Sequence, residues 1–407
     1  MKNRLYLLIV VMLLIFPAMS IAAGTEKIAL TEAVEDSSGL TAKYGSKGFE
    51  FKTKDNKFSL QLRSRLQFRF LTPYASNPRN ISQLEADPVS TFRLQRARLK
   101  VGGHGFQPWI KYYWEYDVSV NRILNYTLSI EKYKKFSVMV GQWKTDYSRE
   151  RRISSGKQMH VDRSIINRPF TLDRQQGICF YGHFDGAGAN NFKYWVSILT
   201  GTGRSTRSND DDKLMYVGRL QWNALNGGTD MSGSDLKISP KPRLSISLGG
   251  ATNTSAYTRF SSGGPGSLDG YSTGLPGQYE VNQGLVEASF KYKGFNFEHE
   301  YHIKTINDKV EFSSNTLSGY YIHAGYFFHQ AMTWVPEPLE LALRYAEVNP
   351  NTDDTSLNDK EVAVAVNWFF SGHNNKLSAD FGWFQSNEFG GASADGTRVR
   401  VQWDISF

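Results

Sequence analysis

The chain has 407 residues, of which 47 are lysine or arginine, 39 are aspartate or glutamate and 14% are aromatic. Beyond residue 23 no apolar run approaches the roughly 20 residues that a membrane-spanning helix needs, so a membrane segment here would have to be a strand. The single cysteine, Cys179, excludes an internal disulfide and indicates a fold held together by its own hydrogen bonds and packing.

Residues 1–23 have the pattern of a secretory signal peptide. Lys2 and Arg4 precede the apolar run 5–16, which is followed by Pro17 and a small-residue stretch. The apolar run is too short to span a bilayer as a helix. We therefore expect 1–23 to be removed on export, which leaves a mature chain that is still positively charged.

Residues 24–57 form the second predicted region, a lead-in on the periplasmic side. Residues 24–47 are polar and offer no apolar face to bury. Phe49 and Phe51, followed by the polar stretch 54–57, indicate a small hairpin directly before the first long strand.

Strict alternation of apolar and polar side chains begins at residue 58. In 58–70 the even positions are mostly apolar, whereas the odd positions carry serine, glutamine, Arg63, Arg65 and Arg69. The last segment, 396–407, repeats this pattern with the apolar residues at odd positions. Such alternation over about ten residues is typical of a strand with one face in lipid and the other in water.

The alternation recurs often enough to predict an all-β fold, a 16-stranded antiparallel transmembrane β-barrel over 58–407. With an even number of strands, the chain enters and leaves the barrel on the periplasmic side. The connections therefore alternate between short periplasmic turns and longer outer loops. Two connections depart from that rule: the outer connection near 119–121 is short and the periplasmic turn 225–241 is long. The predicted strands are 58–70, 90–102, 109–118, 121–131, 135–142, 175–184, 190–200, 213–224, 242–252, 279–293, 295–304, 317–330, 338–348, 360–371, 375–385 and 396–407.

Four motifs resemble those of one family of barrels. They are SRLQ at 64–67, FRLQRARL at 92–99, GQWK at 141–144 and DRS at 162–164. Together they resemble the Gly-Arg-x-Gln, Arg-Arg-Ala-Arg-Leu, Gly-Gln-Phe-Lys and Glu-Arg-Ser motifs of the phosphate-selective porin O and P family. Gln95 stands where that family has its first paired arginine, and Ser64 replaces its glycine, so strict phosphate selectivity does not follow.

The resemblance implies a porin in the outer membrane of a Gram-negative bacterium, with passive diffusion of small anions such as phosphate. It also implies a homotrimer and a long third extracellular loop that folds inward. The expected partners are small anions, outer-membrane lipid and the barrel-assembly machinery, which would engage the C-terminal Phe407.

Basic residues dominate the polar faces of the first, second and last predicted strands. Barrel closure sets the last strand beside the first, so these residues should share one wall with the single acid Asp404. Arginine and lysine rings select anions in a confined channel. The predicted pore-lining residues are Arg63, Arg65, Arg69, Arg96, Arg98, Lys100, Arg398 and Arg400.

The long segment 143–174 is the predicted constriction loop, and it carries a net positive charge. Inside the lumen it would narrow the pore with a positive field, whereas outside it would only attract anions to the mouth. Its predicted constriction residues are Lys144, Arg149, Arg151, Arg152, Lys157, Arg163 and Arg168. Glu287, Glu298 and Glu300 on the opposite side of the barrel predict a transverse field and partial selectivity.

The sequence predicts a channel and not an enzyme, without cofactor, metal or nucleic acid. It contains no Gly-x-Ser-x-Gly, His-Glu-x-x-His or phosphate-binding glycine-loop motif. The odd spacing of His299 and His302 directs the two rings to opposite faces of a strand. The alternatives are a channel for acidic oligosaccharides, which Trp109, Tyr113 and Trp195 would serve as an aromatic track, and an outer-membrane barrel hydrolase.

Overall fold

A computed structural model describes residues 34–35, 39–45, 48–186, 190–204, 206–261 and 264–407. The predicted signal peptide lies outside these residues. Strands dominate, and 16 of them form the barrel. The barrel strands are β4 (Ser59–Thr72), β5 (Thr91–Gly105), β6 (Gln107–Asp117), β7 (Arg122–Tyr133), β8 (Phe136–Lys144), β9 (Arg174–Asp185), β10 (Asn191–Leu199), β11 (Met215–Leu225), β12 (Arg243–Ser255), β13 (Tyr279–Tyr292), β14 (Phe295–Asp308), β15 (Ser313–Tyr326), β16 (Leu339–Asn349), β17 (Asn358–Ser371), β18 (Asn375–Asn387) and β19 (Ser393–Ser406).

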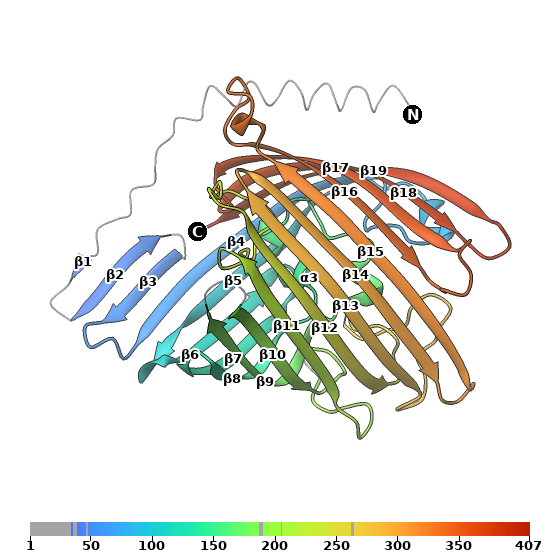
Figure 1. The fold of residues 1–407 in the computed structure, drawn as a ribbon, viewed down its shortest axis with the longest axis horizontal. Coiled ribbons are helices and arrows are strands. Elements are labelled where there is room, and N and C mark those ends of the chain that lie inside the picture. The colour runs from blue at the N-terminus through green and yellow to red at the C-terminus, as the bar shows by residue number, and fades with distance from the viewer. Residues whose placement is uncertain (1–33, 36–38, 46–47, 187–189, 205, 262–263) are drawn as a thin grey trace.

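The barrel closes because β19 pairs with β4, and every neighbouring pair of barrel strands is antiparallel (Figure 1). The backbone of Phe407 completes the seam with two hydrogen bonds of 3.1 Å to Ser64. We call the end where β4 begins and β19 ends the near rim, and the opposite end the far rim. The predicted closed 16-stranded barrel is confirmed.

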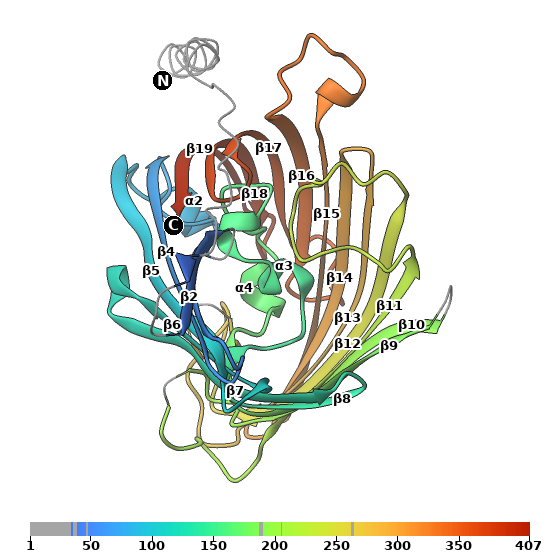
Figure 2. The ribbon, with the colours of Figure 1, turned by 90° about the vertical axis from the view of Figure 1, so that its left-hand side faces the viewer.

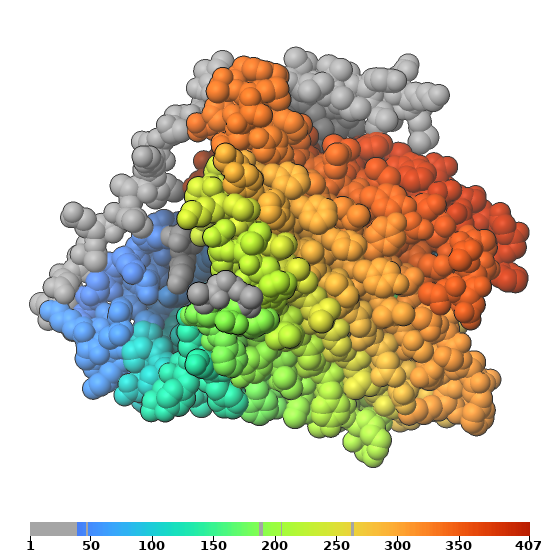
Figure 3. All heavy atoms as spheres, viewed as in Figure 1, coloured from blue at the N-terminus to red at the C-terminus, as the bar shows by residue number. Residues whose placement is uncertain are grey.

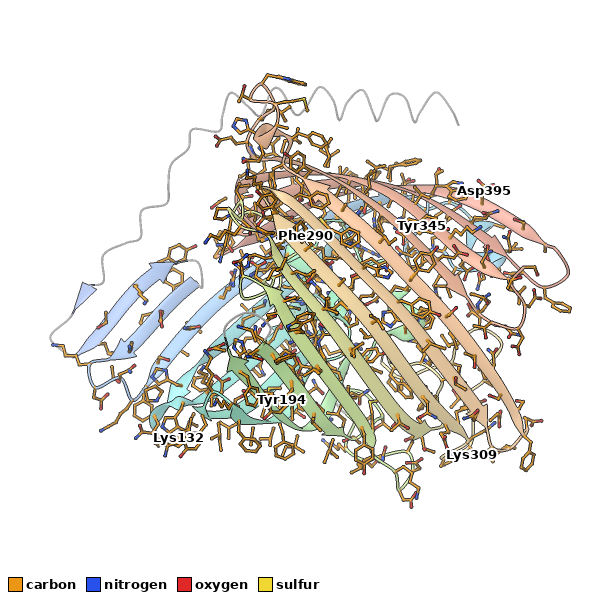
Figure 4. All side chains as sticks on the ribbon, viewed as in Figure 1. Lys132, Tyr194, Phe290, Lys309, Tyr345 and Asp395 are labelled. Atoms are coloured by element: carbon orange, nitrogen blue, oxygen red, sulfur yellow. The ribbon has the colours of Figure 1, made fainter. Side chains whose placement is uncertain are left out.

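The two faces of the strands differ in polarity as the alternation requires. Along β4 the side chains of Leu60, Leu62 and Phe68 are exposed on the outer face, whereas Arg65 and Arg69 are buried on the inner face. Figure 3 shows the outer face of β11–β17, and Figure 4 labels Lys309 at the far rim. An apolar exterior around a polar interior fits a wall that stands in hydrocarbon.

Three short strands precede the barrel. They are β1 (Val34–Glu35), β2 (Leu40–Gly45) and β3 (Gly48–Thr53). β3 pairs with the near-rim part of β4, next to the segment of β4 that pairs with β19. The hairpin β2–β3 therefore prolongs the barrel wall beyond the near rim (Figure 1).

Helical segments are short and few among the described residues, and none is long and apolar enough to cross a membrane. They are α2 (Ile81–Leu84), η1 (Val118–Val120), α3 (Arg149–Arg152), η2 (Ser155–Lys157), α4 (Asn167–Phe170) and η4 (Phe328–Gln330). The predicted strand 317–330 is wrong beyond residue 326, because η4 occupies 328–330 in the connection to β16.

Candidate functional site

The segment 145–173, which we call the inner segment, lies within the ring of strands and carries α3 and α4 (Figure 2). Its first turn is held against β14. The Arg149 guanidinium lies 2.9 Å from the Glu298 carboxylate with both side chains fully buried, and the backbone N–H of Glu150 donates to Glu300 at 2.7 Å. Removing one partner of an ion pair buried in this way strongly destabilises a protein. The pair of Arg149 and Glu298 therefore fixes the position of the inner segment.

The middle of the inner segment is held by strands near the seam. Arg69 of β4 forms an ion pair with Asp162 at 2.9 Å, and the backbone N–H of Val161 donates to Asp380 of β18 at 3.1 Å. Arg65 donates to the hydroxyl groups of Ser154 and Ser155. The inner segment is therefore attached on both sides of the seam.

A second connection, residues 226–242 between β11 and β12, enters the lumen from the near rim. The backbone N–H of Gly233 donates to the carbonyl of Lys157 at 2.7 Å, and Ser234 donates to Glu340 of β16 at 2.9 Å. Lys291 of β13 donates to the backbone carbonyls of Ser232 and Ser234. This connection lies between the inner segment and the strands β13–β16, and it fills the lumen there.

Three cavities follow one another in the lumen beside β5–β10. The far chamber has about 490 Å³, the middle chamber about 340 Å³ and the near chamber about 480 Å³. β7 runs toward the near rim and lines them in that order, with Arg122 in the far chamber, Thr127 in the middle chamber and Glu131 in the near chamber. A hollow of about 680 Å³ between β10 and β14 opens in the outer face and belongs to a different surface.

Arg98, Lys144 and Arg174 line both the far and the middle chamber. They come from β5, β8 and β9, and Lys144 donates to the backbone carbonyl of Arg151 at 3.0 Å. Any solute that passes from one chamber to the other must pass these three cations.

The far chamber carries a large excess of positive charge. Its acidic residues are Asp117 and Asp162, against 13 basic ones. The basic residues are Arg69, Arg79, Arg93, Arg96, Arg98, Arg122, Lys144, Arg151, Arg163, Arg168, Arg174, Arg204 and Arg400.

Local ion pairs reduce this excess but do not remove it. Arg98 contacts Glu115 at 2.9 Å and Asp117 at 3.0 Å. Burial alone would raise the pKa of Asp162, but Arg69 and Arg96 outweigh it and hold that pKa well below its ordinary value. Asp162 is thus ionised near neutral pH, and the basic residues of the far chamber still outnumber its two acids.

The predicted site residues divide into two groups. The chambers bring together Arg69, Arg96, Arg98, Lys100, Arg400, Lys144, Arg151, Arg152, Arg163 and Arg168. The others are used in packing or lie aside from the chambers: Arg63 donates to Asn374, Arg65 holds the inner segment, Arg149 pairs with Glu298, Arg398 stacks on Phe384, and Lys157 meets the connection 226–242.

The predicted transverse field from the opposite wall is wrong. Glu287, Glu298 and Glu300 are fully buried beneath the inner segment. Glu287 pairs with Arg219 at 2.7 Å, Glu298 with Arg149 and His323, and Glu300 with His302. Arg219 and Arg149 compensate the charges of Glu287 and Glu298 locally, and none of the three carboxylates lines a chamber.

Several far-chamber arginines were not among the predicted site residues. Arg79 and Arg204 come from connections at the far rim, Arg122 from the start of β7, and Arg93 and Arg174 from the far-rim ends of β5 and β9. Their shared feature is position at one end of the barrel, which a search along single strands does not reveal.

Comparison with known proteins identifies the family. The family model of the phosphate-selective porin O and P matches residues 81–407. The chain belongs to this family. It is therefore an outer-membrane porin, a channel protein that prefers anions. A search of curated protein sequences found no match.

Solved structures agree with this porin in fold. An anion-selective porin from Comamonas acidovorans is 12% identical, with a TM-score of 0.58 and coverage of 86% of this chain and 100% of its own. The outer membrane channel DcaP of Acinetobacter baumannii is 12% identical, with a TM-score of 0.55 and coverage of 88% and 99%. At such identities the likeness concerns the fold alone.

Proposed function

We propose that small anions such as phosphate diffuse passively through the far, middle and near chambers. The observation that carries this proposal is the excess of basic residues in the far chamber. The far chamber adjoins the middle chamber, which shares three of its cations. In this scheme the near rim faces the periplasm and the far rim faces the outside. Residues 1–23 would be removed on export, and 24–57 would lie in the periplasm before the barrel.

The chemistry of the chambers supports anion passage in two ways. A confined channel strengthens each positive charge relative to bulk water, which raises the local concentration of anions. Repeated sites of moderate strength let an ion move on to the next one. Guanidinium groups add a forked pair of donors that matches phosphate and carboxylate oxygens.

The same residues favour a broad anion preference over strict phosphate selection. Glu115 and Asp117 compensate part of the charge at Arg98, one of the three cations that line both chambers. Gln95 and Ser64 also depart from the family motifs. We expect phosphate to pass together with other small anions.

The proposal extends to assembly. We infer a homotrimer in which each barrel has its own pore, since the family implies it. Phe407, whose backbone completes the barrel seam, is the residue we expect the assembly machinery to engage.

Neutralising three cations of the far chamber, two of which also line the middle chamber, tests the proposal. The combined variant Arg96→Gln, Arg98→Gln and Arg174→Gln should have a weaker anion preference. Its zero-current potential in a KCl gradient should shift toward the value of a cation-selective channel. The matched control is Arg63→Gln, which removes a positive charge that lines neither chamber. An unchanged potential in the triple variant, with barrel folding verified by heat-dependent gel mobility, would refute the assigned route.

A further inference from the structure

We infer that the boundary between the middle and near chambers is a binding site for small aromatic carboxylates. This inference deepens the proposed function and rests on it. The boundary site consists of Met139 on β8, Tyr181 on β9, Lys193 and Trp195 on β10, and Arg152 on α3.

The wall of the boundary site is apolar and aromatic. Trp195 lies directly opposite Tyr181 in the β9–β10 register, and Met139 lies opposite Cys179 in the next inward-facing row. Met139, Tyr181 and Trp195 are half-buried and pack on the buried core, so each keeps part of its side chain open to the lumen. The Tyr181 hydroxyl donates to Glu131 at 2.7 Å, which fixes the ring in the wall.

Arg152 supplies a positioned cation at this wall. Its guanidinium carbon lies 4.5 Å from the centroid of the Trp195 ring, and one nitrogen contacts Asp146 at 2.8 Å. The other terminal nitrogen, Nη1, is buried and has no hydrogen-bond partner among the described residues. A guanidinium stacked on an indole is held in orientation, so its remaining donor is prepared for an anionic oxygen.

The charge at the boundary site remains positive. The middle chamber has five basic residues against Glu115 and Asp146, and the near chamber has three lysines against Glu131. An anion that has passed Arg98, Lys144 and Arg174 therefore meets cations beside an apolar wall, a combination that the arginine-rich far chamber does not offer.

An aromatic carboxylate uses both features of the boundary site. Its carboxylate can accept from Arg152 or Lys193, while its ring packs on the tryptophan, tyrosine and methionine side chains. An inorganic anion gains nothing from the apolar wall. A hydroxylated sugar ring would leave hydroxyl groups against the Met139 side chain, which cannot satisfy them well.

Block of the chloride current in planar bilayers tests this inference, with benzoate, acetate and glucuronate as probes of equal charge. We expect benzoate to halve the current at a concentration about three- to tenfold lower than acetate, the range that one aromatic contact contributes. Trp195→Leu should abolish the difference between benzoate and acetate, and Tyr181→Leu should reduce it. The ratio of the two blocking concentrations is independent of any change in conductance.

The matched control is Trp114→Leu, because Trp114 lies on β6 stacked against Tyr116 and lines none of the three chambers. It should keep the benzoate preference. Equal block by benzoate and acetate in the unmodified porin, an unaltered preference in Trp195→Leu, or stronger block by glucuronate would overturn the inference. A cation-selective zero-current potential would instead contradict the proposed function, so the two failures are distinguishable.

Discussion

At the scale of single residues, Asp162 controls how much of the positive charge in the far chamber is compensated. It lies on the inner segment, 2.9 Å from Arg69 and 4.0 Å from Arg96. Its pKa is held well below the ordinary value, so its ion pairs are fully formed above the pKa of an unfolded aspartate and are lost only as the pH falls through the lower, folded value. We expect the anion preference to be constant between about pH 7 and pH 5 as far as this group is concerned.

Removing this charge should strengthen the preference for anions. Asp162→Asn takes away one of the two acids in the far chamber, so the zero-current potential in a KCl gradient should shift further toward anions. Asp395→Asn is the control, since this exposed carboxylate lies at the far rim and accepts from Trp383 (Figure 4). A shift toward cations in Asp162→Asn would show that the inner segment had moved, or that the chamber is not the route.

At the scale of elements, the contact between the inner segment and the connection 226–242 should set the width of the pore. A Cβ atom on Gly233 would lie 2.8 Å from the backbone nitrogen of Met159 and 2.9 Å from the carbonyl of Lys157. Gly233→Val should therefore separate the two elements at a cost of about 1–3 kcal/mol, as overpacking does. Because the connection lies on the β13–β16 side, the displaced inner segment would move toward the chambers beside β5–β10, so single-channel conductance should fall and fluctuate more.

Gly218→Val is the matched control, because a Cβ atom at this outer-face glycine of β11 meets nothing within 4 Å. Its conductance should equal that of the unmodified porin. If Gly233→Val behaves like this control, the connection does not support the inner segment.

Strands were predictable from the sequence because alternation is a local property. The faces of β4 followed from it, as Leu62 and Arg65 illustrate. The path of the connections was not predictable, since it depends on partners far apart in the chain. The turn 225–241 stood out only by its length, and the burial of Arg149 depends on Glu298, which lies 149 residues further along. The arginines that line the chambers could therefore be named in part, but not separated from those that fasten the inner segment.

At the scale of the whole molecule, the selectivity should come from summed charge and thus depend on salt. The Debye length falls from about 10 Å at 0.1 M salt to about 3 Å at 1 M, so high salt screens the summed charge of the chambers more strongly. We expect the anion preference to be weaker at the higher mean salt concentration, when the ratio of the concentrations on the two sides of the bilayer is kept the same. Selectivity that does not change with salt would indicate sieving by size.

The zero-current potential of the purified porin across a KCl gradient, in a planar bilayer near neutral pH, tests the central claim most directly. If the far chamber lies on the conducting path, chloride carries most of the current and the sign of the potential is that of an anion channel. A potential of the opposite sign would mean that potassium is the preferred ion, and it would contradict the assignment of the arginine-lined chambers as the route.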